Sequence, residues 1–395
     1  MKSWLGKSVL ACGTINLLAW HAAAQPAANA KPAIALVDTA DLSQWQTWSK
    51  EIGWQTLVPS VANDAAMDVR VEALGAAVRD AIHSGSVDPA RIYLAGRGAA
   101  AAGVFFAISR LPDLWAAAVT LGGSPQPAID SDRFYAANFA NVPVLWISPT
   151  ADDQPLAAKL QAAGVPLERR LREQIQMSAV FDWLKERSRE PNPAAIDCET
   201  DSPRFAGCYW IRITRFDAGE RNDVLPSSRM QSAIVASLDL GGFGYKVDDP
   251  GPGLLVSFLP DKYNGPLKVG DRIVELDGKD LADARAYRDQ MAQVKEERQV
   301  AVIVQRGKQH IRIETAEILP RRAPMVTARV QAKYMPEEKE IQIVSRAVTE
   351  MQVTIPPQWV PAAVNWNGVA LEKVEAPGCR LLVIEKALES AKACP

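Results

Sequence analysis

From about residue 33 to about residue 190, short apolar runs alternate with segments whose apolar residues recur at helical spacing. The runs typical of buried strands are 33–38, 54–60, 91–96, 115–123 and 142–149. The helical patterns cover 41–52, 67–85, 99–110, 154–164 and 171–190. This alternation predicts a doubly wound α/β domain over 33–190, with a parallel sheet that is covered by helices on both faces.

Beyond residue 190 the pattern changes from alternating strands and helices to strands. The Pro-rich polar segment 191–203 predicts a domain boundary. A β-type lead-in at 208–231 is expected to open the next domain, which covers 204–319. This domain has a Gly-rich loop, several strand patterns and one short helix at about 282–293.

A second boundary is predicted at 320–324, after which apolar and polar residues alternate. We expect a small antiparallel β module over 325–386, in which Asn367-Gly368 is a typical hairpin turn. Residues 362–371, "AAVNWNGVAL", loosely resemble a module that closes some secreted hydrolases. The fold class expected for the whole chain is therefore α/β followed by β.

Length, composition and charge narrow the class of protein. A chain of 395 residues suggests two or three domains, and 48% hydrophobic with 23% charged residues is an ordinary globular balance. The formal net charge is −2, without a basic patch or a polybasic run. Neither nucleic acid nor an anionic membrane surface is therefore expected as a partner.

The first 24 residues have the pattern of a secretory signal peptide. Lys2 and Lys7 precede an apolar stretch, and an A-x-A cleavage site ends at Ala24. The apolar stretch is too short to span a bilayer, so no transmembrane segment is expected in the mature chain. An alternative is lipidation of Cys12. Either way we expect an exported protein, periplasmic or extracellular.

Removal of the signal would leave an even number of cysteines: Cys198, Cys208, Cys379 and Cys394. Cys198 lies close to Cys208 in sequence, and Cys379 lies close to Cys394, which favours these two structural disulfides in an oxidising compartment. The other two connectivities stay open. Metal binding is the weaker alternative, because neither His83 nor His310 is near a cysteine in sequence. We expect no metal and no cofactor.

Three segments of the first domain resemble the α/β-hydrolase family, and secreted esterases and polyester depolymerases in particular. They are "RIYLAGRGAAA" (91–101), "LWAAAVTLGGSP" (114–125) and "VPVLWISPTADDQP" (142–155). In the family, a G-x-S-x-G turn between a strand and a helix carries the nucleophile. Here the same frame runs from Gly96 to Ala100, and the nucleophile position is Gly98.

The other members of a catalytic triad are also difficult to find. By the resemblance, Asp152 or Asp153 would occupy the acid position, although both also suit a turn or helix cap. The segment where the histidine should follow contains none, and His83 is expected on the far side of the domain. Ser124 and Ser148 also read as turn residues. Without a nucleophile and a base an acid has nothing to orient, so we expect a scaffold without catalysis.

The second domain resembles a PDZ domain over about 228–318. The resemblance rests on "GPLKVGDRIVELDGKDL" (265–281), whose glycines and Asp271 fit the family's core pattern. It implies that "LGGFGY" (240–245) is a Gly-rich loop that captures a peptide's C-terminal carboxylate. The implied peptide-binding residues are Gly242, Phe243, Gly244, Tyr245, Tyr287 and Met291. The alternative is that Phe243, Tyr287 and Met291 are core residues.

Two functions of different classes follow from these patterns. The first is an exported, non-catalytic binding or scaffold protein that holds a protein or peptide C-terminus in a PDZ groove. The second is an active secreted serine hydrolase, an esterase or peptidase, with a non-standard catalytic set. The first is favoured, because both the nucleophile and the base are missing from their expected positions.

Overall fold

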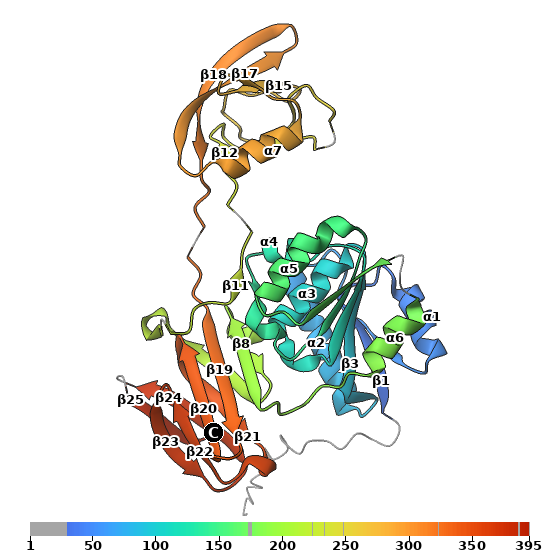
Figure 1. The fold of residues 1–395 in the computed structure, drawn as a ribbon, viewed down its shortest axis with the longest axis vertical. Coiled ribbons are helices and arrows are strands. Elements are labelled where there is room, and N and C mark those ends of the chain that lie inside the picture. Colours follow the sequence, from blue (N-terminus) through green and yellow to red (C-terminus); the bar gives the residue numbers. More distant parts are fainter. Residues whose placement is uncertain are drawn as a thin grey trace, which may run out of the picture. The chain divides into compact units, whose positions relative to one another are not determined.

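The computed structural model describes residues 30–172, 176–222, 224–232, 234–247, 249–322, 324–385 and 388–394. It divides into two compact units (Figure 1). The inserted unit is Gln231–Met325, and the main unit combines Met1–Met230 with Val326–Pro395. The predicted signal peptide, with Lys2, Lys7 and Cys12, lies outside the described residues.

The first part of the main unit is the predicted parallel sheet. Its six strands are in the order β2-β1-β3-β4-β6-β7, and all neighbours are parallel. The strands are β1 (Lys31–Leu36), β2 (Gln55–Leu57), β3 (Val87–Arg97), β4 (Ala117–Leu121), β6 (Val144–Ser148) and β7 (Leu167–Leu171). The helices are α1 (Leu42–Glu51), α2 (Met67–His83), α3 (Ala100–Arg110), α4 (Gln126–Asp130), α5 (Gln154–Ala162) and α6 (Met177–Lys185).

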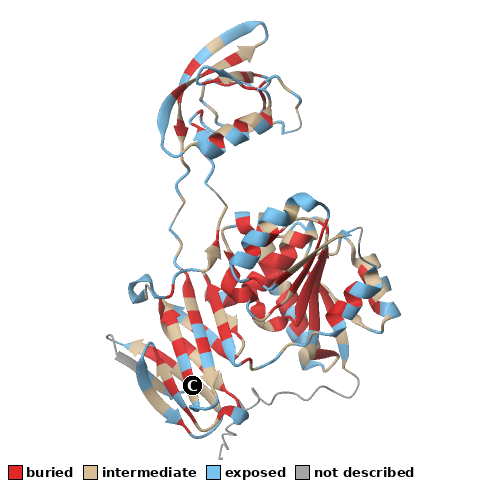
Figure 2. Ribbon diagram, viewed as in Figure 1, coloured by how far each residue is buried: buried red, intermediate tan, exposed pale blue. Residues whose placement is uncertain are grey.

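Helices cover both faces of this sheet, so its central strands are buried along most of their length (Figure 2). On one face α2, α3 and α5 pack in a core that contains Leu74, Phe105 and Leu160. On the other face α1 and α6 pack in a second core that contains Trp45 and Phe181. Burial on both faces explains why these strands are apolar runs without alternation.

The second part of the main unit consists of two antiparallel-rich sheets of five strands each, in the orders β25-β24-β21-β10-β9 and β23-β22-β20-β19-β8. The first sheet holds β9 (Gly207–Cys208), β10 (Ile211–Phe216), β21 (Val348–Ile355), β24 (Gly378–Glu385) and β25 (Leu388–Ala393). The second holds β8 (Ala195–Thr200), β19 (Ala328–Met335), β20 (Glu340–Arg346), β22 (Ala362–Trp366) and β23 (Val369–Val374). Residues of both sheets, such as Met351 and Trp366, share one core, so the sheets pack as a sandwich. At the predicted hairpin, Asn367 and Gly368 both have positive φ, as a type I′ turn requires.

This sandwich corrects the expected position of the lead-in. Residues 208–231 were expected to open the domain 204–319, but β10 pairs with β21, and β8 pairs with β19. The sandwich therefore begins at Ala195 rather than at residue 325. Alternating apolar residues, such as Ile211 and Ile213, bury one face of the lead-in against the C-terminal strands. The inserted unit separates these strands in sequence, which hides their pairing.

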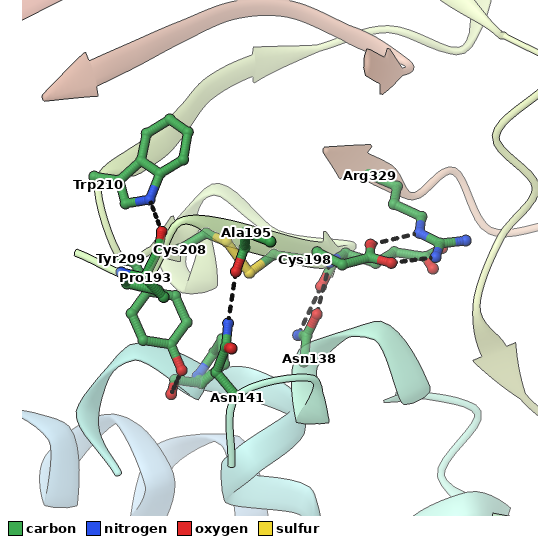
Figure 3. The surroundings of a disulfide bond; sticks show 12 residues. Asn138, Asn141, Pro193, Ala195, Cys198, Cys208, Tyr209, Trp210 and Arg329 are labelled. Atoms are coloured by element: carbon green, nitrogen blue, oxygen red, sulfur yellow. Dashed lines mark hydrogen bonds and ion pairs between the residues drawn. A yellow bond between two sulfur atoms is a disulfide. The ribbon is translucent and has the colours of Figure 1, made fainter. Parts of the chain in front are cut away.

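The structure brings the two predicted cysteine pairs to disulfide distance. Cys198 on β8 and Cys208 on β9 have Cα atoms 6.1 Å apart and join the edge strands of the two sheets (Figure 3). Cys379 on β24 and Cys394 after β25 have Cα atoms 5.4 Å apart. Both separations lie in the usual range. The 198–208 pair therefore closes one edge of the sandwich.

Buried polar groups join the sandwich to the parallel-sheet part. The Asn138 side chain donates to the Glu199 carbonyl at 2.9 Å and accepts from the Glu199 N–H at 2.6 Å (Figure 3). The Arg110 guanidinium is 2% exposed and pairs with Asp68 and Asp201. A short strand β5 (Phe134–Tyr135) also pairs with β11 (Arg229–Met230), just before the inserted unit begins. The two parts thus share one folded unit.

The inserted unit is a curved sheet with one helix, α7 (Ala284–Gln293). The strand order is β12-β18-β17-β15-β14-β13, and β16 pairs with β15. The strands are β12 (Ser237–Leu238), β13 (Gly244–Tyr245), β14 (Leu254–Phe258), β15 (Arg272–Leu276), β16 (Lys279–Asp280), β17 (Arg298–Arg306) and β18 (Gln309–Ile318). Apolar residues of the strands and of α7 form a core of their own, so this unit has what an independent domain needs.

Candidate functional site

Gly98 stands at the turn from β3 into α3, where the sequence resembles a hydrolase elbow. Its φ is +56°, and its N–H donates to the Leu121 carbonyl at 3.0 Å. A Cβ on the neighbouring Gly123 would lie only 1.9 Å from the Gly98 carbonyl oxygen. The turn therefore brings two backbone segments together closely, and small residues are required there for packing.

The two candidate acids are engaged in local turn contacts. The Thr150 side chain accepts from the Asp152 N–H at 3.2 Å, and the Asp153 carboxylate accepts from the buried Ser148 hydroxyl at 2.6 Å. These contacts match the turn-and-cap alternative that the sequence left open.

His83, the described histidine of the main unit, lies away from the elbow. It is the last residue of α2 and precedes β3, whereas Gly98 follows the opposite end of β3. The His83 Nδ1 lies 3.2 Å from the Arg79 carbonyl oxygen, as expected for a residue at a helix C-terminus. His310 belongs to β18 of the inserted unit. The structure therefore brings no described histidine of the main unit to the elbow.

The loop after β1 shows a further difference from a working hydrolase site, and the sequence analysis did not identify it. In the hydrolase arrangement a backbone N–H from the loop beside the elbow helps to hold the oxyanion. Here the Thr39 N–H donates to the Asn63 side chain at 2.9 Å, and the Ala40 N–H donates to Asp38 at 3.1 Å. Both donors already have partners within the protein.

The inserted unit has a groove of about 530 Å³ between α7, the Gly-rich loop and β12. Five of the six residues that were predicted to bind a peptide line it together: Gly242, Phe243, Tyr245, Tyr287 and Met291. The groove is otherwise lined by Val235, Ala236, Ser237, Leu238, Asp239, Gly241, Arg288 and Ile318. Gly244 does not line it, because its Cβ position faces Phe258 at 3.0 Å.

The groove walls are aromatic and largely apolar. The rings of Tyr245 and Tyr287 meet edge to face with centroids 5.6 Å apart, and Phe243 lies 6.3 Å from Tyr245. Tyr287 and Met291 are 6% and 0% exposed and belong to the core of the unit, so they are core residues as well as groove residues. Burial raises the pKa of Tyr287 to about 12.

The Gly-rich loop ends in an edge strand. β13 is the last strand in its sheet order and pairs with β14 through Gly244 opposite Phe258 and Tyr245 opposite Val256. The Lys246 N–H continues this pairing to the Leu255 carbonyl at 3.0 Å. No other described strand pairs with the far side of β13, and such an edge is a template for an added strand.

Several groove residues were missed by the sequence analysis. The wall formed by β12 has only two strand residues, Ser237 and Leu238, which is too short for a periodic pattern to reveal. Arg288 and Asp239 add opposite charges to the two walls. Arg288 lies three residues before Met291 on α7, a spacing that places both on one side of a helix, so its proximity to the groove could have been inferred.

The inserted unit has a second hollow, of about 370 Å³, at the C-terminal end of α7. Three of its charged lining residues are paired within the protein, since Arg298 pairs with Asp277 and Glu317, each at 2.7 Å. Its described lining residues include no Gly-rich loop. The first groove is therefore the better candidate for recognition.

No described helix is long and apolar enough to cross a membrane. Among the same residues, no group of His, Cys, Asp or Glu side chains is arranged to hold a metal ion.

Comparison with known proteins finds only partial likenesses. No protein-family model and no curated protein matches the chain. Part of it is similar to an HtrA-type protease, AlgW with decapeptide, at 25% identity and a TM-score of 0.18, over 23% of this chain and 31% of that one. Another part is similar to a thermostable esterase at 19% identity and a TM-score of 0.23, over 30% of this chain and 36% of that one. The chain thus spans about a third of each solved structure, and TM-scores this low assign neither fold nor function.

Proposed function

We propose that this chain is an exported binding protein that holds the free C-terminus of an extended polypeptide in the groove of its inserted unit, a PDZ-like domain. The observation that carries the proposal is the position of the Gly-rich loop. It opens directly into an edge strand whose far side pairs with no other described strand, and it lies beside an aromatic groove about 530 Å³ in volume. This combination suits capture of a carboxylate together with addition of a strand.

The peptide would be held by three kinds of contact. Backbone N–H groups of the Gly-rich loop, at Gly242 and Phe243, would bind the terminal carboxylate. The peptide backbone would add to β13 beyond Tyr245, and alternate side chains would enter the groove toward Met291. The positive φ of Gly242, +76°, supports this assignment, because it lets successive N–H groups turn to one side.

The parallel-sheet part would serve as a hydrolase-like scaffold without catalysis. Gly98 supplies no nucleophile. The Asp153 carboxylate accepts from Ser148, and Asp152 joins the same turn through its backbone N–H. In addition, the N–H groups of the adjacent loop already have acceptors. The two cysteine pairs at disulfide distance are compatible with an oxidising, extracytoplasmic location.

A peptide array with free C-termini, probed with the full chain, tests this proposal. Peptides selected by the wild type should lose binding to Tyr245→Ala, which removes one wall of the groove, and keep it to Gly98→Ser, which alters only the elbow. Circular dichroism would establish that both variants are folded. Selected peptides that bind Tyr245→Ala and wild type equally would contradict the groove assignment.

A further inference from the structure

Tyr263 contacts the Gly-rich loop from a segment far from it in sequence. It lies in the connection after β14, where its N–H closes a turn onto the Pro260 carbonyl at 2.9 Å. The Tyr263 hydroxyl donates to the Leu240 carbonyl at 2.7 Å and accepts from the Leu267 N–H at 3.1 Å. One hydroxyl therefore joins Leu240, the first residue of the Gly-rich loop, to the turn that leads into β15.

The Tyr263 ring also explains why two glycines flank it. A Cβ on Gly241 would lie 3.1 Å from a ring carbon of Tyr263, and a Cβ on Gly265 would lie 2.3 Å from its hydroxyl oxygen. A side chain at Gly265 would therefore displace the hydroxyl from Leu240. The ring occupies the space that these glycines leave free.

The base of the loop is fixed, whereas its glycines are intrinsically free to move. The Asp239 N–H donates to Ala316 at 2.8 Å, and the Asp239 carbonyl accepts from Thr315 at 2.8 Å. At the next residue, Leu240, the carbonyl is held by Tyr263. Beyond it Gly241 and Gly242 have φ of +79° and +76°, and glycine loses more conformational entropy on ordering than any other residue.

We propose that Tyr263 is a positioning residue, which orders the Gly-rich loop before a peptide carboxylate arrives. This inference rests on the proposed peptide-binding function. Without the hydroxyl, the Leu240 carbonyl loses this hydrogen bond, and part of the loop must be ordered during binding, which weakens affinity. One net hydrogen bond corresponds to a change of roughly three- to tenfold in affinity. The loss of affinity should be selective for peptides with a free C-terminal carboxylate, because that is the group the Gly-rich loop would bind.

The test compares the full chain with Tyr263→Phe and, as a control in the main unit, Tyr334→Phe. The probes are one peptide selected from the array and its C-terminal amide. Tyr263→Phe should lower the affinity for the free acid roughly three- to tenfold and leave the affinity for the amide unchanged. Tyr334→Phe should change neither affinity. Equal weakening of acid and amide by Tyr263→Phe would indicate a merely structural role and overturn the proposal.

Amide hydrogen exchange in Gly241–Gly244 gives a second readout that needs no peptide. Exchange should be faster in Tyr263→Phe and in Gly265→Ala, whose side chain would displace the hydroxyl, than in the wild type. Unchanged exchange in both variants would overturn the positioning role. Faster exchange together with no carboxylate preference in the wild type would retain the positioning role and reject the proposed function, so the two failures are distinguishable.

Discussion

Replacing Glu199 should loosen both chain segments that lead into and out of the inserted unit. Glu199 lies on β8 and is 1% exposed. One carboxylate oxygen accepts from Ser227, at 2.5 Å, and from Thr327. The other accepts from the Ser228 N–H at 2.6 Å and its hydroxyl at 2.7 Å. Ser227 and Ser228 precede Gln231, whereas Thr327 follows Met325. One carboxylate therefore forms hydrogen bonds with both the segment that leads into the inserted unit and the segment that leads out of it.

The expected loss of stability follows from the groups that Glu199→Ala leaves without an acceptor. A hydrogen bond to a charged group contributes about 1.5–3 kcal/mol, but bonds that share one carboxylate are not additive. We therefore expect a loss of about 4 kcal/mol in the free energy of unfolding, close to the effect of breaking a buried ion pair. Glu199→Gln keeps one acceptor oxygen and should cost about half of this, roughly 2 kcal/mol.

Intrinsic tryptophan fluorescence in a urea titration can measure this loss in the main unit alone. None of the 11 tryptophans lies between Gln231 and Met325, so the signal does not report unfolding of the inserted unit. The midpoint should fall in the order wild type, Glu199→Gln, Glu199→Ala. The exposed Glu338→Ala should change the free energy of unfolding by less than about 0.5 kcal/mol.

Limited trypsin digestion supplies an independent check at Arg321 and Arg322, which lie in the segment that returns from the inserted unit. Cleavage there should be faster in Glu199→Ala than in the wild type. A change in unfolding free energy below about 1 kcal/mol, with unaltered cleavage, would refute the role given to Glu199.

Three further outcomes are expected. Gly98→Ser should gain no labelling by a serine-reactive fluorophosphonate, because no described histidine of the main unit reaches it; clear labelling would contradict the non-catalytic assignment. Cys198→Ser should destabilise the main unit by about 2–3 kcal/mol under oxidising conditions and by much less under reducing conditions, measured by urea titration. Burial raises the pKa of the Asp271 carboxyl, but hydrogen bonds from Arg306 and the Lys268 N–H outweigh it and hold the pKa below the ordinary 3.8. The charged carboxylate therefore stabilises the fold above about pH 4, and this contribution is lost as pH falls through the folded-state pKa. Asp271→Asn should lower the free energy of unfolding at neutral pH. It should also make that free energy depend less on pH in the acid range, as measured by a circular dichroism titration.

Local patterns predicted those elements whose burial is periodic or complete. The parallel sheet was predictable because strands such as β3 and β6 are buried on both faces and read as apolar runs. The hairpin at Asn367-Gly368 was predictable because its turn requires two positive φ values. The disulfide pairs followed from short separations in sequence.

The pairing of β8 and β10 with the C-terminal strands was not predictable from local patterns. Those partners lie beyond the inserted unit in sequence. Alternation of apolar and polar residues shows that a strand has one buried face, but it does not identify the strands that cover this face. The residues that line the groove could be predicted more readily than the residues that hold the Gly-rich loop in place. Tyr263 acts through its hydroxyl on Leu240, a contact between loops that leaves no periodic signal in the sequence.

We propose above all that the inserted unit recognises a free carboxylate at a polypeptide C-terminus. The most direct test is calorimetric titration of the full chain with one array-selected peptide and with its C-terminal amide. We expect the free acid to bind at least about tenfold more tightly, which corresponds to about 1.4 kcal/mol. Equal affinities for the acid and the amide would contradict the account.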